Sequence, residues 1–120
     1  MVSDQIATFL NFARDAGGKY EMARQDEEQA NLETQDILHS LEIYTHPYNQ
    51  KAKLAGKLVD VRRRRRVAKD TMDVYAPIAE WVEENRAVIK SLERLLGDVR
   101  KAENIQKNRF YINRIVFNTC

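Results

Sequence analysis

The sequence has little of several residue types that would direct its fold or its chemistry. One cysteine, Cys120, stands among 120 residues, so an internal disulfide and a cysteine-based zinc site are both excluded. Two prolines and four glycines are few turn residues for a β-sheet protein. No stretch reaches the roughly 18 apolar residues that a membrane-spanning helix needs. We therefore expect an all-helical cytoplasmic protein with no membrane partner.

Charge of both signs is abundant, and the two signs are separated along the chain. Lys and Arg total 20 against 18 Asp and Glu, and a net charge of +2 is too small to indicate nucleic-acid binding by itself. The acids concentrate in residues 25–36 and the bases in residues 51–69. Because either segment could bind the other in a second copy, this distribution favours a homo-oligomer.

Helical spacing of apolar residues extends over most of the chain. Gly17 and Gly18 are expected to end a first short helix, and His46-Pro47 to form a loop that Asn49 follows as a helix cap. The pattern predicts one helical domain, residues 1–120, with helices over 3–16, about 19–44, 49–84 and 86–107, and a short extended tail over 108–120.

The third predicted helix has the repeat of helices that pack side by side. Pro77 is expected to kink this helix without ending it. If the chain turns at Asn85, residues 49–84 and 86–107 form an antiparallel hairpin; without the turn they form one long rod. The predicted fold class is therefore all-α, an elongated helical bundle or hairpin with coiled-coil-like packing. The repeat alternates steps of four and three through Leu54, Leu58, Val61, Arg65, Ala68, Met72, Tyr75, Ala79 and Val82.

Five consecutive arginines, Arg62 to Arg66, interrupt this repeat. Successive helical residues are about 100° apart, so the run surrounds its helix, and the repeat places Arg65 on the packing seam. A buried guanidinium costs several kcal/mol unless it is paired. One interpretation is that it reaches solvent or that a carboxylate pairs with it, the candidates being Asp36, Glu42 and Asp60.

The other interpretation is an arginine-lined site for an anionic ligand. Guanidinium groups donate two parallel hydrogen bonds to phosphate and stay charged, and aromatic rings offer a base a stacking surface. We find no catalytic residue, metal ligand or cofactor motif in the sequence, and we do not expect an enzyme. The candidate ligand-binding residues are Arg62, Arg63, Arg65, Arg66, Lys69, Tyr75, Arg109 and Tyr111.

Two other functions fit these residues less well. The basic run could follow a nucleic-acid backbone, but the chain has no recognisable nucleic-acid-binding motif. The acids Glu27 and Glu28 invite comparison with the magnesium-binding EExxE element of helical nucleotide pyrophosphohydrolases. Asn31 stands where that element needs its third acid, and Glu33 and Asp36 are too close in sequence to come from a second helix.

Two segments, Leu58–Asp70 (LVDVRRRRRVAKD) and Leu95–Glu103 (LLGDVRKAE), resemble small helical accessory proteins of phages and prophages of Gram-positive bacteria. The resemblance covers roughly residues 37–109 and transfers no catalytic residue. It implies a phage-encoded protein in the host cytoplasm that counters host defence. Some proteins of this kind sequester cyclic nucleotide signals as oligomers, and others block CRISPR nucleases.

The function predicted from the sequence is thus an anti-defence binding protein of the phage type. We expect a homo-oligomeric helical bundle that sequesters an anionic, nucleotide-like ligand, such as a cyclic nucleotide, through its arginine-rich helix. One alternative is an inhibitor or regulator that binds a host defence protein or a nucleic-acid complex, as anti-CRISPR proteins do. Another is a structural coiled-coil subunit.

Overall fold

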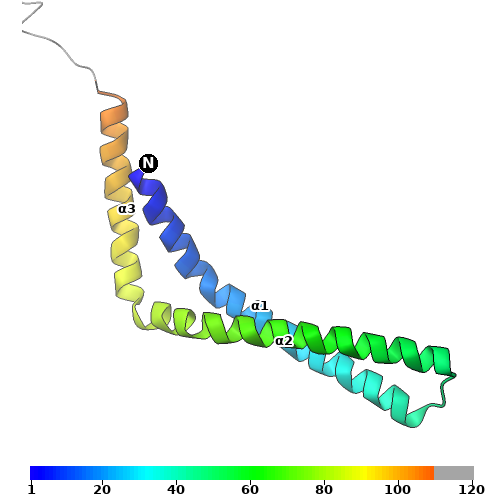
Figure 1. Ribbon diagram of the computed structural model, residues 1–120. Coiled ribbons are helices and arrows are strands. Elements are labelled where there is room, and N and C mark those ends of the chain that lie inside the picture. The colour runs from blue at the N-terminus through cyan, green and yellow to red at the C-terminus, as the bar shows by residue number, and fades with distance from the viewer. Residues whose placement is uncertain (110–120) are drawn as a thin grey trace, which may run out of the picture. The chain divides into compact units, whose positions relative to one another are not determined.

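The computed structural model describes residues 1–109, and in this part of the chain the fold is built from three α-helices (Figure 1). Helix α1 spans Val2–Ile43, α2 spans Tyr48–Glu84 and α3 spans Arg86–Lys107. The predicted all-α class is confirmed. From residue 110 onward, the predicted C-terminal tail lies outside the described residues.

Helix α1 runs without a break through Gly17 and Gly18, so the prediction of two helices over 3–16 and 19–44 is wrong. Both glycines are exposed, their φ angles are negative, and a Cβ atom at either would meet nothing within 4 Å. A glycine inside a helix costs only about 0.5–1 kcal/mol relative to alanine. The buried residues Ala16 and Ala23, seven apart on either side, show that the helix keeps its phase.

The loop between α1 and α2 lies where the sequence placed it, at residues 44–47. His46 Nε2 lies 3.1 Å from Ser40 Oγ and 3.0 Å from the Ser40 carbonyl oxygen, which ties the loop to the end of α1. The predicted cap at Asn49 is wrong, because Pro47 occupies the N-cap position with extended backbone and makes no side-chain cap bond. Proline fixes φ near the value that this position needs.

The turn predicted at Asn85 is confirmed. Its backbone N–H donates to the Trp81 carbonyl at 3.0 Å, and its side-chain amide donates to the same oxygen at 2.8 Å, so the last turn of α2 is closed. Pro77 lies inside α2, which does not stop there. Helix α2 packs against α1. The expected hairpin of residues 49–84 with 86–107 stays a prediction, because these two segments belong to different compact units.

The chain divides into two compact units. Within the described chain, the terminal unit contains residues 1–10 and 86–109, and the hairpin unit contains residues 11–85. In the terminal unit Leu10, Ile89 and Leu96 are buried. The backbone N–H of Ser3, itself buried, donates to Glu103 Oε2 of α3 at 3.3 Å.

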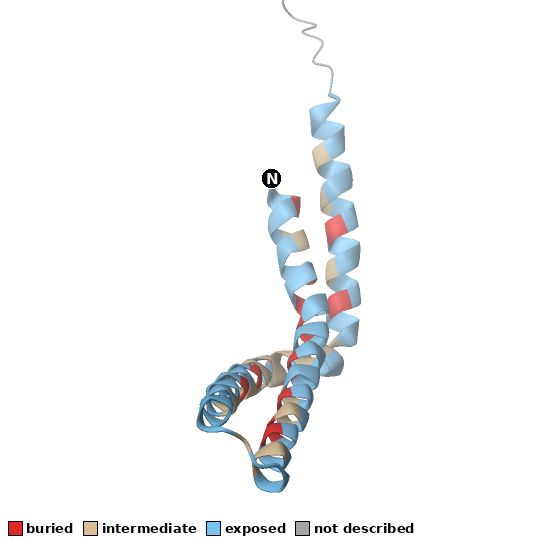
Figure 2. Ribbon diagram, turned by 90° about the vertical axis from the view of Figure 1, so that its right-hand side faces the viewer, coloured by how far each residue is buried: buried red, intermediate tan, exposed pale blue. Residues whose placement is uncertain are grey.

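In the hairpin unit, α1 and α2 meet along a seam in which both helices follow the repeat of fours and threes. The buried positions of α1 recur along one side of the helix (Figure 2). Five of the ten buried apolar residues in the described chain are alanines, whose small side chains let two helices approach closely. The α1 seam positions are Ala13, Ala16, Tyr20, Ala23, Glu27, Ala30, Thr34, Ile37 and Leu41.

Candidate functional site

Arg65 lies in the seam, as the repeat predicted, with 23% of its side chain exposed. Its Nε donates to Asn31 Oδ1 at 3.0 Å, and its Nη2 lies 3.9 Å from Glu27 Oε1. Glu27 is 22% exposed and occupies a seam position of α1. An acid therefore meets Arg65 across the seam. The predicted candidates Asp36, Glu42 and Asp60 are wrong, because α1 packs on α2 through small and polar residues such as Ala23 and Glu27.

Arg64 is also bound by α1. Its Nη2 makes an ion pair with Glu33 Oε2, and both side chains are partly exposed. Two members of the arginine run are thus engaged in holding α1 against α2. These contacts give Arg64 and Arg65 a structural role. They give no such role to the other three arginines, Arg62, Arg63 and Arg66.

The hairpin has two flanks, one on either side of the seam. A groove lined by Lys19, Met22, Asp26, Arg64, Val67 and Thr71, each directly before a seam residue, defines the groove flank. Residues directly after a seam residue lie about 200° around the helix axis from the groove-flank residues. They form the second flank, which we call the arginine flank. On α2 the arginine flank contains Arg62, Arg66 and Lys69.

The cations of the arginine flank are close to one another. Arg62 and Arg66 are four residues apart, Lys69 follows three residues later, and such positions are neighbours on a helix surface. Arg62, Arg63 and Arg66 are exposed, and within residues 1–109 none of them makes a hydrogen bond or an ion pair. Like charges four residues apart destabilise a helix by about 0.2–0.5 kcal/mol. A bound anion would remove that repulsion.

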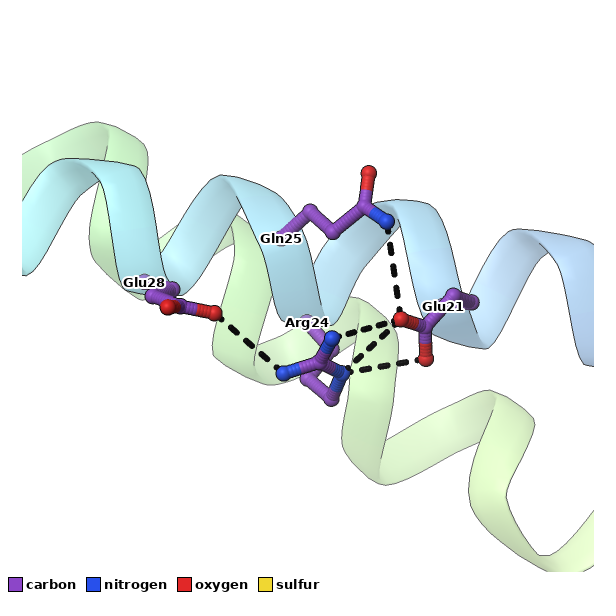
Figure 3. Close-up of polar contacts among 4 residues, drawn as sticks. All are labelled: Glu21, Arg24, Gln25 and Glu28. Carbon is purple, nitrogen blue, oxygen red and sulfur yellow. Dashed lines mark hydrogen bonds and ion pairs between the residues drawn. The ribbon is translucent and has the colours of Figure 1, made fainter.

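Two α1 acids on the same flank, Glu21 and Glu28, are already engaged within their own helix (Figure 3). Arg24 Nη2 lies 2.6 Å from Glu21 Oε1, and Arg24 Nη1 lies 3.3 Å from Glu28 Oε2. Hydrogen bonds from Arg24 lower the pKa of Glu21, and the pairing with Glu21 raises the pKa of Arg24. The charges of Glu21 and Glu28 are therefore partly balanced by Arg24, and α2 keeps its excess of positive charge.

The remaining predicted site residues lie elsewhere. Tyr75 is half-buried at a seam position of α2. Arg109 is exposed and belongs to the terminal unit, and Tyr111 lies outside the described residues. The structure thus brings together the exposed cations of α2. Sequence reasoning missed Glu27, Asn31 and Glu33, although the repeat of α1 was the signal that could have found them.

Residues 1–109 contain no group of three or more His, Cys, Asp or Glu side chains arranged to bind a metal ion. None of the helices in this part of the chain combines the length and the apolar character needed to cross a bilayer. Comparison of the chain with protein-family models, curated proteins and solved structures gives no match.

Proposed function

We propose that the protein is a non-enzymatic binding protein that holds an anionic, nucleotide-like ligand on the arginine flank of α2. In this proposal copies of the chain assemble into a helical bundle, and the protein serves a phage as an accessory, anti-defence factor. The observation that carries the proposal is the exposure of Arg62 and Arg66 on this flank without an acidic partner in residues 1–109.

The chemistry of the flank supports a phosphate-bearing ligand. Guanidinium groups donate paired hydrogen bonds to phosphate oxygens, and Arg62 and Arg66, one helical turn apart, can both reach a single phosphate group. Lys69 adds a third positive charge on the same side. The ligand-binding set is narrower than the sequence prediction, because Arg65 binds α1.

The test is ligand binding by native mass spectrometry and calorimetry, with cyclic AMP, cyclic di-AMP and inorganic phosphate as probes. We expect at least one nucleotide to bind, and the double variant Arg62→Ala, Arg66→Ala to weaken that binding by at least tenfold. Arg100→Ala, which removes an exposed arginine of α3, is the matched control and should leave the affinity unchanged. Absence of binding by the unmodified chain, or an equal loss in the control, would overturn the proposal.

A short DNA duplex added to the same assays separates a small ligand from a nucleic-acid partner. Binding to a polyanion weakens steeply with salt, by about one log unit of affinity per log unit of salt for each phosphate contacted. Tight binding to duplex DNA with such a dependence, and none to the nucleotides, would replace the proposal with the nucleic-acid alternative.

A further inference from the structure

The groove flank of α2 presents a second apolar stripe that the hairpin leaves uncovered. Val67, Val74 and Trp81 are spaced seven and seven apart and are 65%, 62% and 44% exposed. Ile78 lies between them on the same flank, half-buried. Met22 of α1 is 63% exposed and lines the groove beside Val67. We define these five residues as the outer stripe.

The outer stripe repeats the pattern of an interface that this helix already makes. Each of its α2 members directly precedes a seam residue, so the stripe has the same alternation of fours and threes as the seam with α1. A helix with two such stripes has two packing surfaces, and α1 occupies only one of them. The arginine flank at the same level carries Asp73 and Glu80 and has no comparable stripe.

We infer that the outer stripe is the contact surface for a second copy of this chain, with the two α2 helices antiparallel about a two-fold axis at Val74. Val67 and Trp81 are each seven residues from Val74, so the axis pairs Val67 of one copy with Trp81 of the other. Val74 meets its own counterpart. Such an isologous contact is the commonest way in which identical subunits pair.

The charges of α2 fix the antiparallel direction. Arg63 is four residues before Val67 and Glu84 is three residues after Trp81, so both exposed side chains lie beside the outer stripe, at its opposite ends. They are about 16 Å and 15 Å from Val74 at 1.5 Å per residue. An antiparallel pair therefore brings Arg63 of each copy level with Glu84 of the partner, whereas a parallel pair would place arginine beside arginine.

This inference shares with the proposed function only the assembly of copies. Ligand binding is tested on the arginine flank, whereas assembly is tested on the groove flank without any ligand. Failure of one can therefore be told from failure of the other.

The first experiment measures the mass of the full chain in solution by light scattering after gel filtration. We expect the unmodified protein at twice its chain mass of 14.0 kDa and Val74→Asp at the single mass, with unchanged helix content by circular dichroism. Val59→Asp is the matched control, because Val59 is an exposed valine of α2 that follows a seam residue and lies off the outer stripe. It should remain a dimer. A monomeric unmodified protein, or a dimeric Val74→Asp, overturns the inference.

A second experiment fixes the direction without disturbing the fold. With Cys120 replaced by serine, Val74→Cys should form a disulfide-linked dimer under mild oxidation, since the axis places two copies of residue 74 face to face. Val67→Cys alone should not cross-link, but an equimolar mixture of Val67→Cys and Trp81→Cys should. Cross-linking of Val67→Cys with itself would indicate parallel helices and would overturn the antiparallel assignment.

Discussion

The hairpin unit has two halves that use their apolar residues in opposite ways. Glu27 of α1 and Arg65 of α2 mark the boundary between the two halves. In the half nearer the 44–47 loop, large side chains fill the seam: the core cluster there contains Ala30, Ile37 and Val61, packed against Leu41, Leu54 and Leu58. In the other half, the open half, the buried seam residues are alanines only: Ala13, Ala16, Ala23 and Ala68.

On the groove flank, the two halves differ in the opposite sense from the seam. The groove flank of the loop half carries Glu33, Asp36, Lys57 and Arg64, whereas the groove flank of the open half carries the outer stripe. On the groove flank the loop half is therefore charged and the open half apolar, whereas the exposed apolar residues Leu38 and Val59 of the loop half lie on the arginine flank. The difference places the buried core cluster in the loop half and leaves the groove flank of the open half as an apolar surface on which a second copy could pack.

The largest effect should come from the loop-half core. Ile37 is 9% exposed within the cluster, so Ile37→Ala should lower the free energy of unfolding by about 2–4 kcal/mol through lost burial and a remaining cavity. Leu38→Ala, at a neighbouring residue that is 47% exposed, should change it by no more than about 0.5 kcal/mol. Urea unfolding of the full chain measures both. Equal losses would mean that the loop half does not carry the core.

The polar layer between the halves should show the next largest effect. Arg65→Ala leaves Glu27 and Asn31 without their partner, and we expect a loss of about 1–2 kcal/mol, less than for a fully buried pair because these side chains remain one-fifth exposed. Arg63→Ala, with no such contact in residues 1–109, should lie within about 0.5 kcal/mol of the unmodified protein.

Replacing Glu27 and Arg65 together by leucine should restore or raise the free energy of unfolding, because the buried charges are removed as a pair. Thermal unfolding of the three variants tests the layer. If the double variant is less stable than Arg65→Ala, the attraction between Glu27 and Arg65 exceeds the free-energy cost of removing both charges from water.

The open half can be strengthened through its backbone alone. Gly17 and Gly18 are exposed inside α1, and a Cβ atom at either position would meet nothing within 4 Å. Each change to alanine should therefore stabilise the protein by about 0.5–1 kcal/mol. Gly56→Ala in the loop half has the same open surroundings and should give the same gain. A loss at residue 17 or 18 alone would show that α1 does break there.

These glycines show what sequence reasoning could and could not reach. The fold class, the loop after α1 and the turn at Asn85 followed from periodicity and turn residues. The continuity of α1 did not, because glycine pairs commonly end helices and the seam of α1 consists of alanine, threonine and glutamate, which a search for large apolar residues passes over. Reading the repeat through Ala16 and Ala23 would have shown that the phase is kept across both glycines.

The small and polar seam residues of α1 also explain which part of the candidate site could be predicted. The position of Arg65 on the seam could be predicted, since α2 has a clear apolar repeat. Its partner could not, because Glu27 lies in a part of α1 whose packing positions are alanine, threonine and glutamate rather than large apolar residues. Which arginines stay exposed depends on the register of α1 against α2, and that register is a property of the packed pair.

The smallest effect concerns Glu21 on the surface of the open half. Hydrogen bonds from Arg24 lower the pKa of Glu21 in the folded chain, so the pair stabilises the fold above the unfolded pKa of about 4.3 and this contribution is lost as the pH falls through the folded value. Both side chains are about half exposed, so little stability depends on it. Carbon-13 NMR titration should show a lowered pKa that Arg24→Gln returns toward the ordinary value and that Arg62→Gln leaves unchanged. A shift with Arg62→Gln would mean that the arginine flank of α2 acts on the α1 acids. Arg62 would then interact with the acids of α1 and would not be free to bind a ligand.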